Sequence, residues 1–296
     1  MTARILSLVP AATDWVVDLG LADRLVGVTH ECDVPDGLDP EVVVTPAVAP
    51  DPSDPEGIDA AVSATAADDQ PLYRIDDARV AALGPTLVLN QRLCEVCAVS
   101  PTQAEQVAAE AGAQVLTLSG VTLEGLLGDA RRLGDALGAS DRAERLVEEL
   151  RRRLDAVAEA VRGRPARATA VVEWPAPVWV AGHWVPDQVA VAGGHDVAGA
   201  SGAPSRRGTW AELAGAEVTV LGPCGYDLET TLAHAPAFVP DDRDAVWAMD
   251  ADRELSRPSA GAVDGVETLA RILHPDVLGP PEPHRAQPVR AASVPR

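Results

Sequence analysis

Cysteine side chains carry the most specific candidate chemistry in this sequence of 296 residues. Cys94 and Cys97 are separated by two residues, a spacing found in metal half-sites and in redox pairs. Cys32 and Cys224 could supply two further thiolates and complete a zinc or iron–sulfur site. Free cysteine also packs as a small apolar residue. The four cysteines therefore leave metal binding and packing open as alternatives.

Two histidines have neighbours that favour ligand binding. His30 precedes Glu31, and His183 lies between Gly182 and Trp184. A neutral imidazole can bind a metal ion or the metal centre of a cofactor. His195 follows two glycines, and this pattern predicts a turn.

Aromatic residues make up only 3% of the chain, so their positions are informative. We expect Tyr73, Trp174, Trp184 and Tyr226 to offer flat faces to a large ring ligand. Arginines at 206, 207 and 257 could bind carboxylate, amide or phosphate groups through paired hydrogen bonds. The complete set of predicted ligand-binding residues is His30, Glu31, Tyr73, Gln91, Glu173, Trp174, His183, Trp184, Arg206, Arg207, Tyr226 and Arg257.

Motifs of common enzyme classes are absent. The sequence has no GxSxG, HExxH or phosphate-binding loop, and no GxGxxG turn follows its first expected strand. His30 and Glu31 could activate the thiol of Cys32, but nothing specifies a substrate. Catalysis is therefore possible but unsupported by any motif, and we name no catalytic residue.

The candidate residues follow short apolar runs that read as strands. In open α/β sheets, ligands bind beyond the carboxyl ends of parallel strands. Alternation of such runs with amphipathic segments predicts two mostly parallel α/β sheets. The expected strands are Ile5–Val9, Leu25–Val28, Thr86–Leu89, Gln114–Leu118, Ala168–Glu173, Val178–Ala181, Val218–Leu221 and Val246–Asp250. The expected helices are Ala11–Leu19, Ile58–Ala67, Ile75–Leu83, Thr102–Ala111, Val185–Ala192, Trp210–Ala214, Asp227–Ala233 and Ala262–Leu273.

One longer helix separates the two series. Ser140 and early acidic residues suit a helix start, and leucine and valine recur at three- and four-residue spacing up to Gly163. We expect this helix to connect two Rossmann-like lobes. The predicted organisation is an N-terminal lobe at 1–139, a connecting helix at 140–163, a C-terminal lobe at 164–278 and a disordered tail at 279–296.

Charge and hydropathy exclude several classes of function. The formal net charge is −21, and every basic side chain other than histidine is arginine. Such an acidic surface repels phosphate backbones, so we expect no nucleic-acid partner. No apolar run approaches the roughly 20 residues that span a bilayer, and no secretory signal precedes the first strand. We therefore expect a cytoplasmic protein without a membrane span.

Together these segments resemble a known family. The stretches Ile5–Thr13 and Leu19–Thr29 are similar to the start of class III periplasmic binding proteins, which include vitamin B12, siderophore and haem binders. The resemblance covers about residues 4–275 and implies two α/β lobes joined by one rigid helix. The segments around His30, Cys94, His183, Arg206 and Cys224 resemble a subgroup described as cobalamin-binding proteins.

The resemblance implies a cleft between the lobes that holds cobalamin, a related corrinoid or another metal-containing ligand. The residues also allow two alternatives. Cys32, Cys94, Cys97 and Cys224 could form a zinc or iron–sulfur centre with a sensing or enzymatic role. The chain could also be an exported substrate-binding protein of an ABC transporter whose start codon is misassigned. The sequence does not identify a protein partner.

Overall fold

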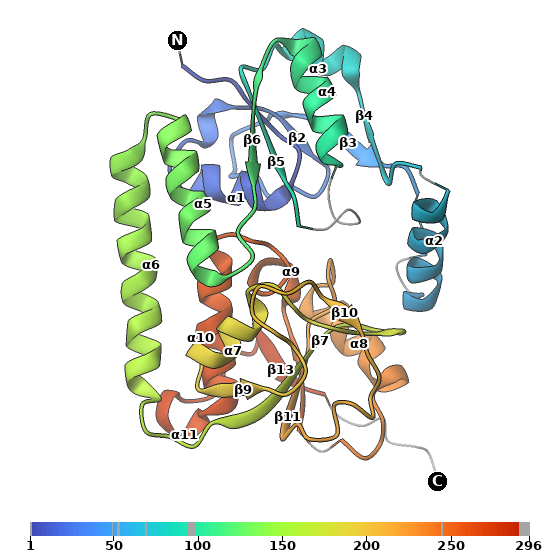
Figure 1. Cartoon of the computed structure of the whole chain (residues 1–296), viewed down its shortest axis with the longest axis vertical. Helices are drawn as coiled ribbons and strands as arrows, with labels where there is room; N and C mark the ends of the chain where they lie inside the picture. Colours follow the sequence, from blue (N-terminus) through green and yellow to red (C-terminus); the bar gives the residue numbers. More distant parts are fainter. Residues whose placement is uncertain are drawn as a thin grey trace. The chain divides into compact units, whose positions relative to one another are not determined.

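The computed structural model describes residues 2–48, 50–51, 54–68, 70–93, 99–243 and 245–289 (Figure 1). The chain divides into two compact α/β units. The first comprises Met1–Gly120 and Glu124–Glu148, and the second comprises Val121–Leu123 and Glu149–Arg296. Helix α6 (Ser140–Ala160) begins in the first unit and ends in the second. Within the described residues, no helix is both long and apolar enough to cross a membrane.

The first unit is built on a six-stranded sheet in the order β4-β3-β2-β1-β5-β6. Its strands are parallel except β4, which runs antiparallel to β3. Helices α3 and α4 cover one face of this sheet, and α1 and α5 lie on the other (Figure 1). Strands β1 and β5 are buried along their whole length, as expected for parallel strands covered on both faces. The strands are β1 (Ile5–Ser7), β2 (Leu25–Thr29), β3 (Glu41–Pro46), β4 (Tyr73–Ile75), β5 (Leu87–Gln91) and β6 (Gln114–Leu118). The helices are α1 (Pro10–Asp18), the 3-10 turn η1 (Ala22–Arg24), α2 (Pro55–Ala67), α3 (Asp77–Leu83), α4 (Pro101–Ala111) and α5 (Leu123–Ala136).

Local sequence signals explain where two of these helices begin and end. The Asp76 side chain accepts a hydrogen bond from the Arg79 backbone N–H at the start of α3. Ser100 does the same for Gln103 at the start of α4. Gly84 and Gly112 end these helices in the left-handed conformation, which glycine adopts without steric cost.

The second unit has a seven-stranded sheet in the order β10-β8-β7-β11-β12-β13, and β9 also pairs with β7. Strands β9, β7, β11 and β12 are mutually parallel, whereas β8, β10 and β13 join antiparallel. Helices α7 and α10 lie side by side in this unit (Figure 1). The strands are β7 (Arg167–Pro175), β8 (Val178–Val180), β9 (Gly194–Asp196), β10 (Arg206–Arg207), β11 (Val218–Leu221), β12 (Val246–Met249) and β13 (Ala286–Pro288). The remaining helices are α7 (Val185–Val191), α8 (Leu228–Phe238), α9 (Ala251–Glu254), α10 (Gly261–Leu273) and α11 (Pro275–Leu278).

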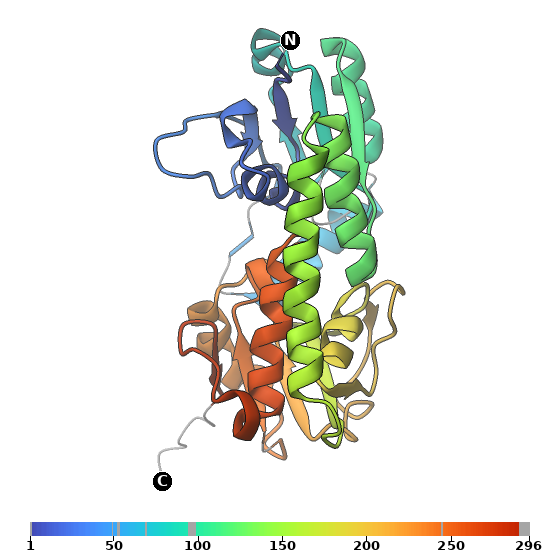
Figure 2. The same cartoon turned by 90° about the vertical axis from the view of Figure 1, so that its left-hand side faces the viewer.

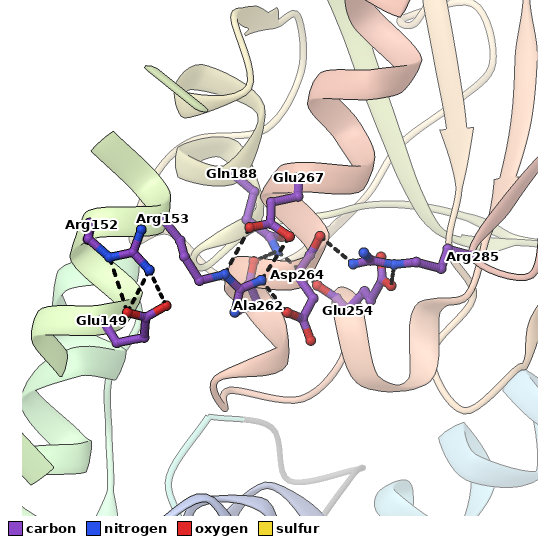
Figure 3. A network of polar contacts seen from close by, with 9 residues as sticks. All are labelled: Glu149, Arg152, Arg153, Gln188, Glu254, Ala262, Asp264, Glu267 and Arg285. Atoms are coloured by element: carbon purple, nitrogen blue, oxygen red, sulfur yellow. Dashed lines mark hydrogen bonds and ion pairs between the residues drawn. The ribbon is translucent and has the colours of Figure 1, made fainter. Parts of the chain in front are cut away.

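The C-terminal half of α6 packs along α10 (Figure 2). Arg153 on α6 donates hydrogen bonds to Asp264 at 2.5 Å and to Glu267 at 2.8 Å on α10 (Figure 3). In the same network, Gln188 of α7 donates to the backbone oxygens of Glu254 and Ala262 at 2.8 and 2.7 Å. These contacts hold α6, α7, α9 and α10 together.

The predicted α/β fold class is confirmed, and three local expectations are wrong. Residues 210–214 form turns and no helix, because the segment is too short to propagate one. His195 lies in β9, where Ala168 on β7 is its register partner, and not in a turn. Residues 279–289 are not disordered, since β13 pairs with β12 and Ala286 is buried. Residues 286–288 are ordered because they pair with β12, and the local composition does not predict this pairing.

Candidate functional site

The carboxyl ends of β7 and β11 form one edge of the second sheet, because these two strands are parallel. Glu173 and Trp174 lie near the end of β7, and Cys224 to Asp227 follow β11. The Cys224 backbone N–H donates to the Glu173 carbonyl oxygen at 3.1 Å. The two predicted segments are therefore in direct contact.

Glu173 is also tied to the loop before β10. Ser205 Oγ donates a hydrogen bond to Glu173 Oε2, and the Gly182 backbone N–H donates to Ser205 Oγ at 3.2 Å. Burial raises the pKa of Glu173 because desolvation disfavours its charged form, and the Ser205 hydrogen bond offsets part of this effect. A Cβ at position 182 would collide with the backbone of Ala203 and Pro204. Glycine at 182 therefore allows the two loops to meet.

His183 follows directly and has an unusual backbone conformation. Its φ angle is +53°, in the left-handed region that residues other than glycine rarely adopt. The conformation is held by hydrogen bonds from its N–H to the Ala203 oxygen at 2.6 Å and to its oxygen from Gly202 at 2.9 Å. Burial lowers the pKa of His183, which favours a neutral imidazole at pH 7. Its ring stacks on Trp184 with centroids 5.8 Å apart.

A small cavity of about 30 Å³ lies among these groups. Two residues that line it carry buried polar atoms without a hydrogen-bond partner among the described residues, namely Trp184 Nε1 and Ser256 Oγ. Trp184 is only 4% exposed, so its ring packs inside the unit instead of presenting an open face. The lining residues are Val171, Glu173, Ala181, Gly182, His183, Trp184, Val185, Gly222, Leu255 and Ser256.

An aromatic cluster lies beside this edge. Trp174 meets Tyr226 edge to face with centroids 5.2 Å apart, and Tyr226 lies 5.7 Å from the His234 ring. Trp174 is half-buried and donates from Nε1 to the Ala176 oxygen at 3.1 Å. Tyr226 is buried at 6% exposure. Trp174 is therefore the more accessible of the two predicted aromatic contacts.

The predicted arginines differ in their surroundings. Arg206 and Arg207 are exposed on β10, where Arg206 pairs with Glu212 at 3.1 Å. The Arg207 guanidinium lies 5.5 Å from the centroid of the Trp179 ring. Arg257 is only 7% exposed and pairs with Asp252 at 2.6 Å, so its guanidinium is buried in the unit.

The first unit holds the other predicted ligand residues. His30 lies 6.3 Å from Tyr73 between ring centroids, and its Nε2 lies 3.7 Å from Glu31. His30 Nδ1 contacts the Val44 oxygen at 3.3 Å. Gln91 ends β5 and is buried, with no hydrogen-bond partner for Oε1 among the described residues. His30 and Glu31 thus follow β2, Gln91 ends β5, and Tyr73 begins β4.

The four-cysteine centre stays a prediction. Cys32 lies in the first unit, where Thr13 Oγ1 donates to its sulfur at 3.0 Å, and Cys224 lies in the second. Cys94 and Cys97 fall outside the described residues. No group of three histidine, cysteine or acidic side chains that could hold a metal ion occurs within the part of the chain that the structure describes.

Three further residues were not among the predicted ligand-binding residues, two in the second unit and one in the first. Ser205 and Ser256 are ordinary polar loop residues by sequence, although Ser205 lies in a segment that carries the family resemblance. Asn90 is fully buried near the end of β5, and neither of its side-chain amide atoms has a partner among the described residues. Its position beside Gln91 was the available signal.

Comparison with known proteins matches residues 5–218 to a family described as periplasmic binding protein. A substrate-binding protein of an ABC transporter from Listeria monocytogenes EGD-e has a TM-score of 0.69 and 16% identity, with 93% of this chain and 99% of that chain covered. A periplasmic haem-binding protein from Pseudomonas aeruginosa has a TM-score of 0.63 and 21% identity, with 98% of this chain and 96% of that chain covered. The periplasmic vitamin B12-binding protein of Vibrio cholerae has a TM-score of 0.64 and 19% identity, with 92% of this chain and 96% of that chain covered. No curated protein matches the sequence significantly.

Proposed function

This chain belongs to the periplasmic binding protein family, and we propose that it binds a large ring ligand with a metal centre, of the corrinoid or haem class. The observation that carries the proposal is the aromatic cluster of Trp174, Tyr226 and His234 at the carboxyl edge of the second sheet. Trp174 and His234 are only half-buried, and accessible aromatic faces provide apolar contact area for a flat macrocycle. The similar structures named for haem and vitamin B12 support this ligand class.

Polar residues near the cluster suit the edges and the centre of such a ligand. Arg206 and Arg207 are exposed and can donate hydrogen bonds to peripheral groups. His183 is the residue of the second unit that would bind the metal centre, because burial favours its neutral form and only a neutral imidazole donates an electron pair to a metal. In the first unit His30 is the corresponding candidate.

The proposal concerns binding and assigns no catalytic step. The cytoplasmic location stays a prediction, and so does the position of the ligand between the two lobes.

Visible absorption of anaerobically purified protein tests the proposal. The protein is mixed separately with hydroxocobalamin and with haemin, and free ligand is removed by desalting. Retention of one of the two chromophores near one equivalent per chain is the expected result. Replacement of Trp174 by Ala should weaken retention about tenfold or more, because one aromatic contact in a ligand site contributes on the order of 1–2 kcal/mol.

Two results would overturn the proposal. Retention of neither chromophore by a folded protein would remove the ring-ligand class. Broad brown absorption in the untreated sample, with no added ligand retained, would favour an iron–sulfur centre on the cysteines instead.

A further inference from the structure

Two residues that line the small cavity beside Glu173 carry polar atoms with no hydrogen-bond partner among the described residues. Trp184 Nε1 can only donate a hydrogen bond, and Ser256 Oγ can donate or accept. Both atoms are buried, and a buried polar atom without a partner costs roughly 1–3 kcal/mol. Native structures seldom keep such atoms unless water or a ligand satisfies them. The cavity is therefore a candidate site for a small polar group.

Glu173 defines what kind of group would be accepted. Its carboxyl already accepts a hydrogen bond from Ser205, so this side chain acts as an acceptor toward its surroundings. A second donor beside it would be favourable, whereas a carboxylate there would place acceptor oxygens against an acceptor. The occupant must also accept the Trp184 N–H.

A primary carboxamide meets both requirements, since its oxygen accepts and its nitrogen donates twice. A carboxylate only accepts, so it cannot donate to Glu173. The cavity volume of about 30 Å³ exceeds the roughly 10–15 Å³ that a water-sized group requires by the same kind of measure. Glu173, His183 and Ser256 are each half-buried, so the lining reaches the surface of the second unit.

Close backbone packing and backbone hydrogen bonds hold the walls of the cavity in place. Gly182 meets the backbone of Ala203 and Pro204, and His183 is held in its left-handed conformation by two backbone hydrogen bonds. A Cβ at Gly222 would collide with Leu255. The donors and acceptors are thus held in place before a ligand arrives, which lowers the entropy lost on binding.

We propose that this cavity binds a terminal carboxamide of the ligand, and that it thereby selects an amide-bearing corrinoid over ring ligands whose side chains end in carboxylates. The inference rests on the proposed function and narrows its ligand class. Corrinoids such as cobinamide carry peripheral primary amides, whereas haem carries two propionates. The same contacts would discriminate between two corrinoids that differ only in these groups.

The test compares dicyanocobinamide with dicyanocobyrinic acid, which has the same macrocycle with carboxylates in place of amides. Binding is measured by absorbance titration at pH 7 in 0.15 M salt, and haemin is titrated in parallel. We expect the wild-type protein to prefer cobinamide at least tenfold. Glu173→Gln should reduce this preference about tenfold, because glutamine can donate to a carboxylate. Glu159→Gln is the matched control, since it removes one charge from an exposed position on α6 and should leave the preference within twofold.

Trp184→Phe tests the donor while retaining an aromatic ring. It should weaken cobinamide binding about tenfold and cobyrinic acid binding by less, with the unfolding transition measured to establish that the variant is folded. Ser256→Ala is the second variant if Trp184→Phe does not fold.

The outcomes separate this inference from the proposed function. Equal binding of the two corrinoids, or an unchanged preference in Glu173→Gln, overturns the amide site and leaves a water molecule as its occupant. Haemin binding without cobinamide binding also overturns it while the ring-ligand function stands. Failure of all three ligands to bind overturns both.

Discussion

Ser205 Oγ donates to Glu173 Oε2 and accepts from the Gly182 N–H, so one hydroxyl joins the end of β7 to the loops before α7 and β10. The relationship spans 32 residues of sequence. The bridge positions the desolvated carboxyl of Glu173 beside the cavity, which His183 with its left-handed backbone conformation also lines. The arrangement of these three segments therefore depends on Ser205, a residue with no unusual chemistry of its own.

Ser205→Ala should lower the free energy of unfolding by about 1–2 kcal/mol, because the Gly182 N–H and the Glu173 carboxyl both lose a partner. Urea denaturation followed by tryptophan fluorescence measures the effect. Ser201→Ala, at an exposed position nearby, is the control and should change stability by less than about 0.5 kcal/mol. Equal effects of the two substitutions would show that the Ser205 hydrogen bonds contribute nothing.

Asp250→Asn should stabilise the protein at pH 7 by about 0.5–1 kcal/mol. Burial raises the pKa of Asp250, and repulsion from Asp252 and Asp227 adds to the effect, while Arg257 opposes it. A raised pKa in the folded state means that protonation favours folding. The stabilisation that protonation of Asp250 provides is fully present below its unfolded-state pKa near 4. It is lost as the pH rises through the pKa of Asp250 in the folded protein.

The gain from Asp250→Asn should therefore shrink toward zero as the pH falls from 7 to about 4. Urea denaturation of both proteins at several pH values measures this trend. A gain that is constant over this range would contradict the assignment of the effect to ionisation of Asp250.

Arg285→Ala should destabilise the second unit by about 3 kcal/mol, because it leaves the buried carboxylate of Glu254 without its ion-pair partner. Arg285 Nε donates to Glu254 Oε1 at 2.5 Å, and Nη2 donates to the Asp264 backbone oxygen at 2.7 Å (Figure 3). Thermal unfolding provides the measurement. Arg145→Ala, at an exposed position of α6, is the matched control.

A double variant separates charge from lost packing in this case. Glu254→Gln in the Arg285→Ala background should recover part of the stability, because it removes the unpaired charge. No recovery would assign the loss to the contacts of residues 279–289 with the rest of the unit instead.

Cys94→Ser should change corrinoid or haem affinity by less than about twofold if the ring-ligand proposal holds. The proposed ligand contacts are made by aromatic side chains and not by thiols. Elemental analysis of the purified wild-type and variant proteins measures bound zinc and iron in parallel. Loss of a stoichiometric metal in the variant would instead support the predicted four-cysteine centre.

Several elements were predictable from the sequence because their signals are local. The strand Gln114–Leu118 has the predicted bounds, and the helix that begins at Ser140 follows from its apolar spacing and early acidic residues. Strands β3 and β4 were not predicted. β3 follows a proline- and aspartate-rich stretch, β4 has only three residues, and each becomes a strand by pairing within the sheet.

The candidate site divides in the same way. Its chemistry-bearing residues, such as Glu173, Trp174 and His183, were found from the sequence, because polar residues after apolar strands converge at the carboxyl edge of a parallel sheet. Their individual environments were not predictable. Burial of Trp184, pairing of Arg257 with Asp252 and the bridge through Ser205 all join segments that meet only on folding.

The sequence by itself determined the α/β class, the family resemblance and the set of residue types available for binding, because these depend on local periodicity and composition. Only the tertiary structure decided which polar atoms are buried without partners, which side chains face a cavity and which are packed away. Those properties depend on distances between residues far apart in the chain, and hydrophobic periodicity does not encode such distances.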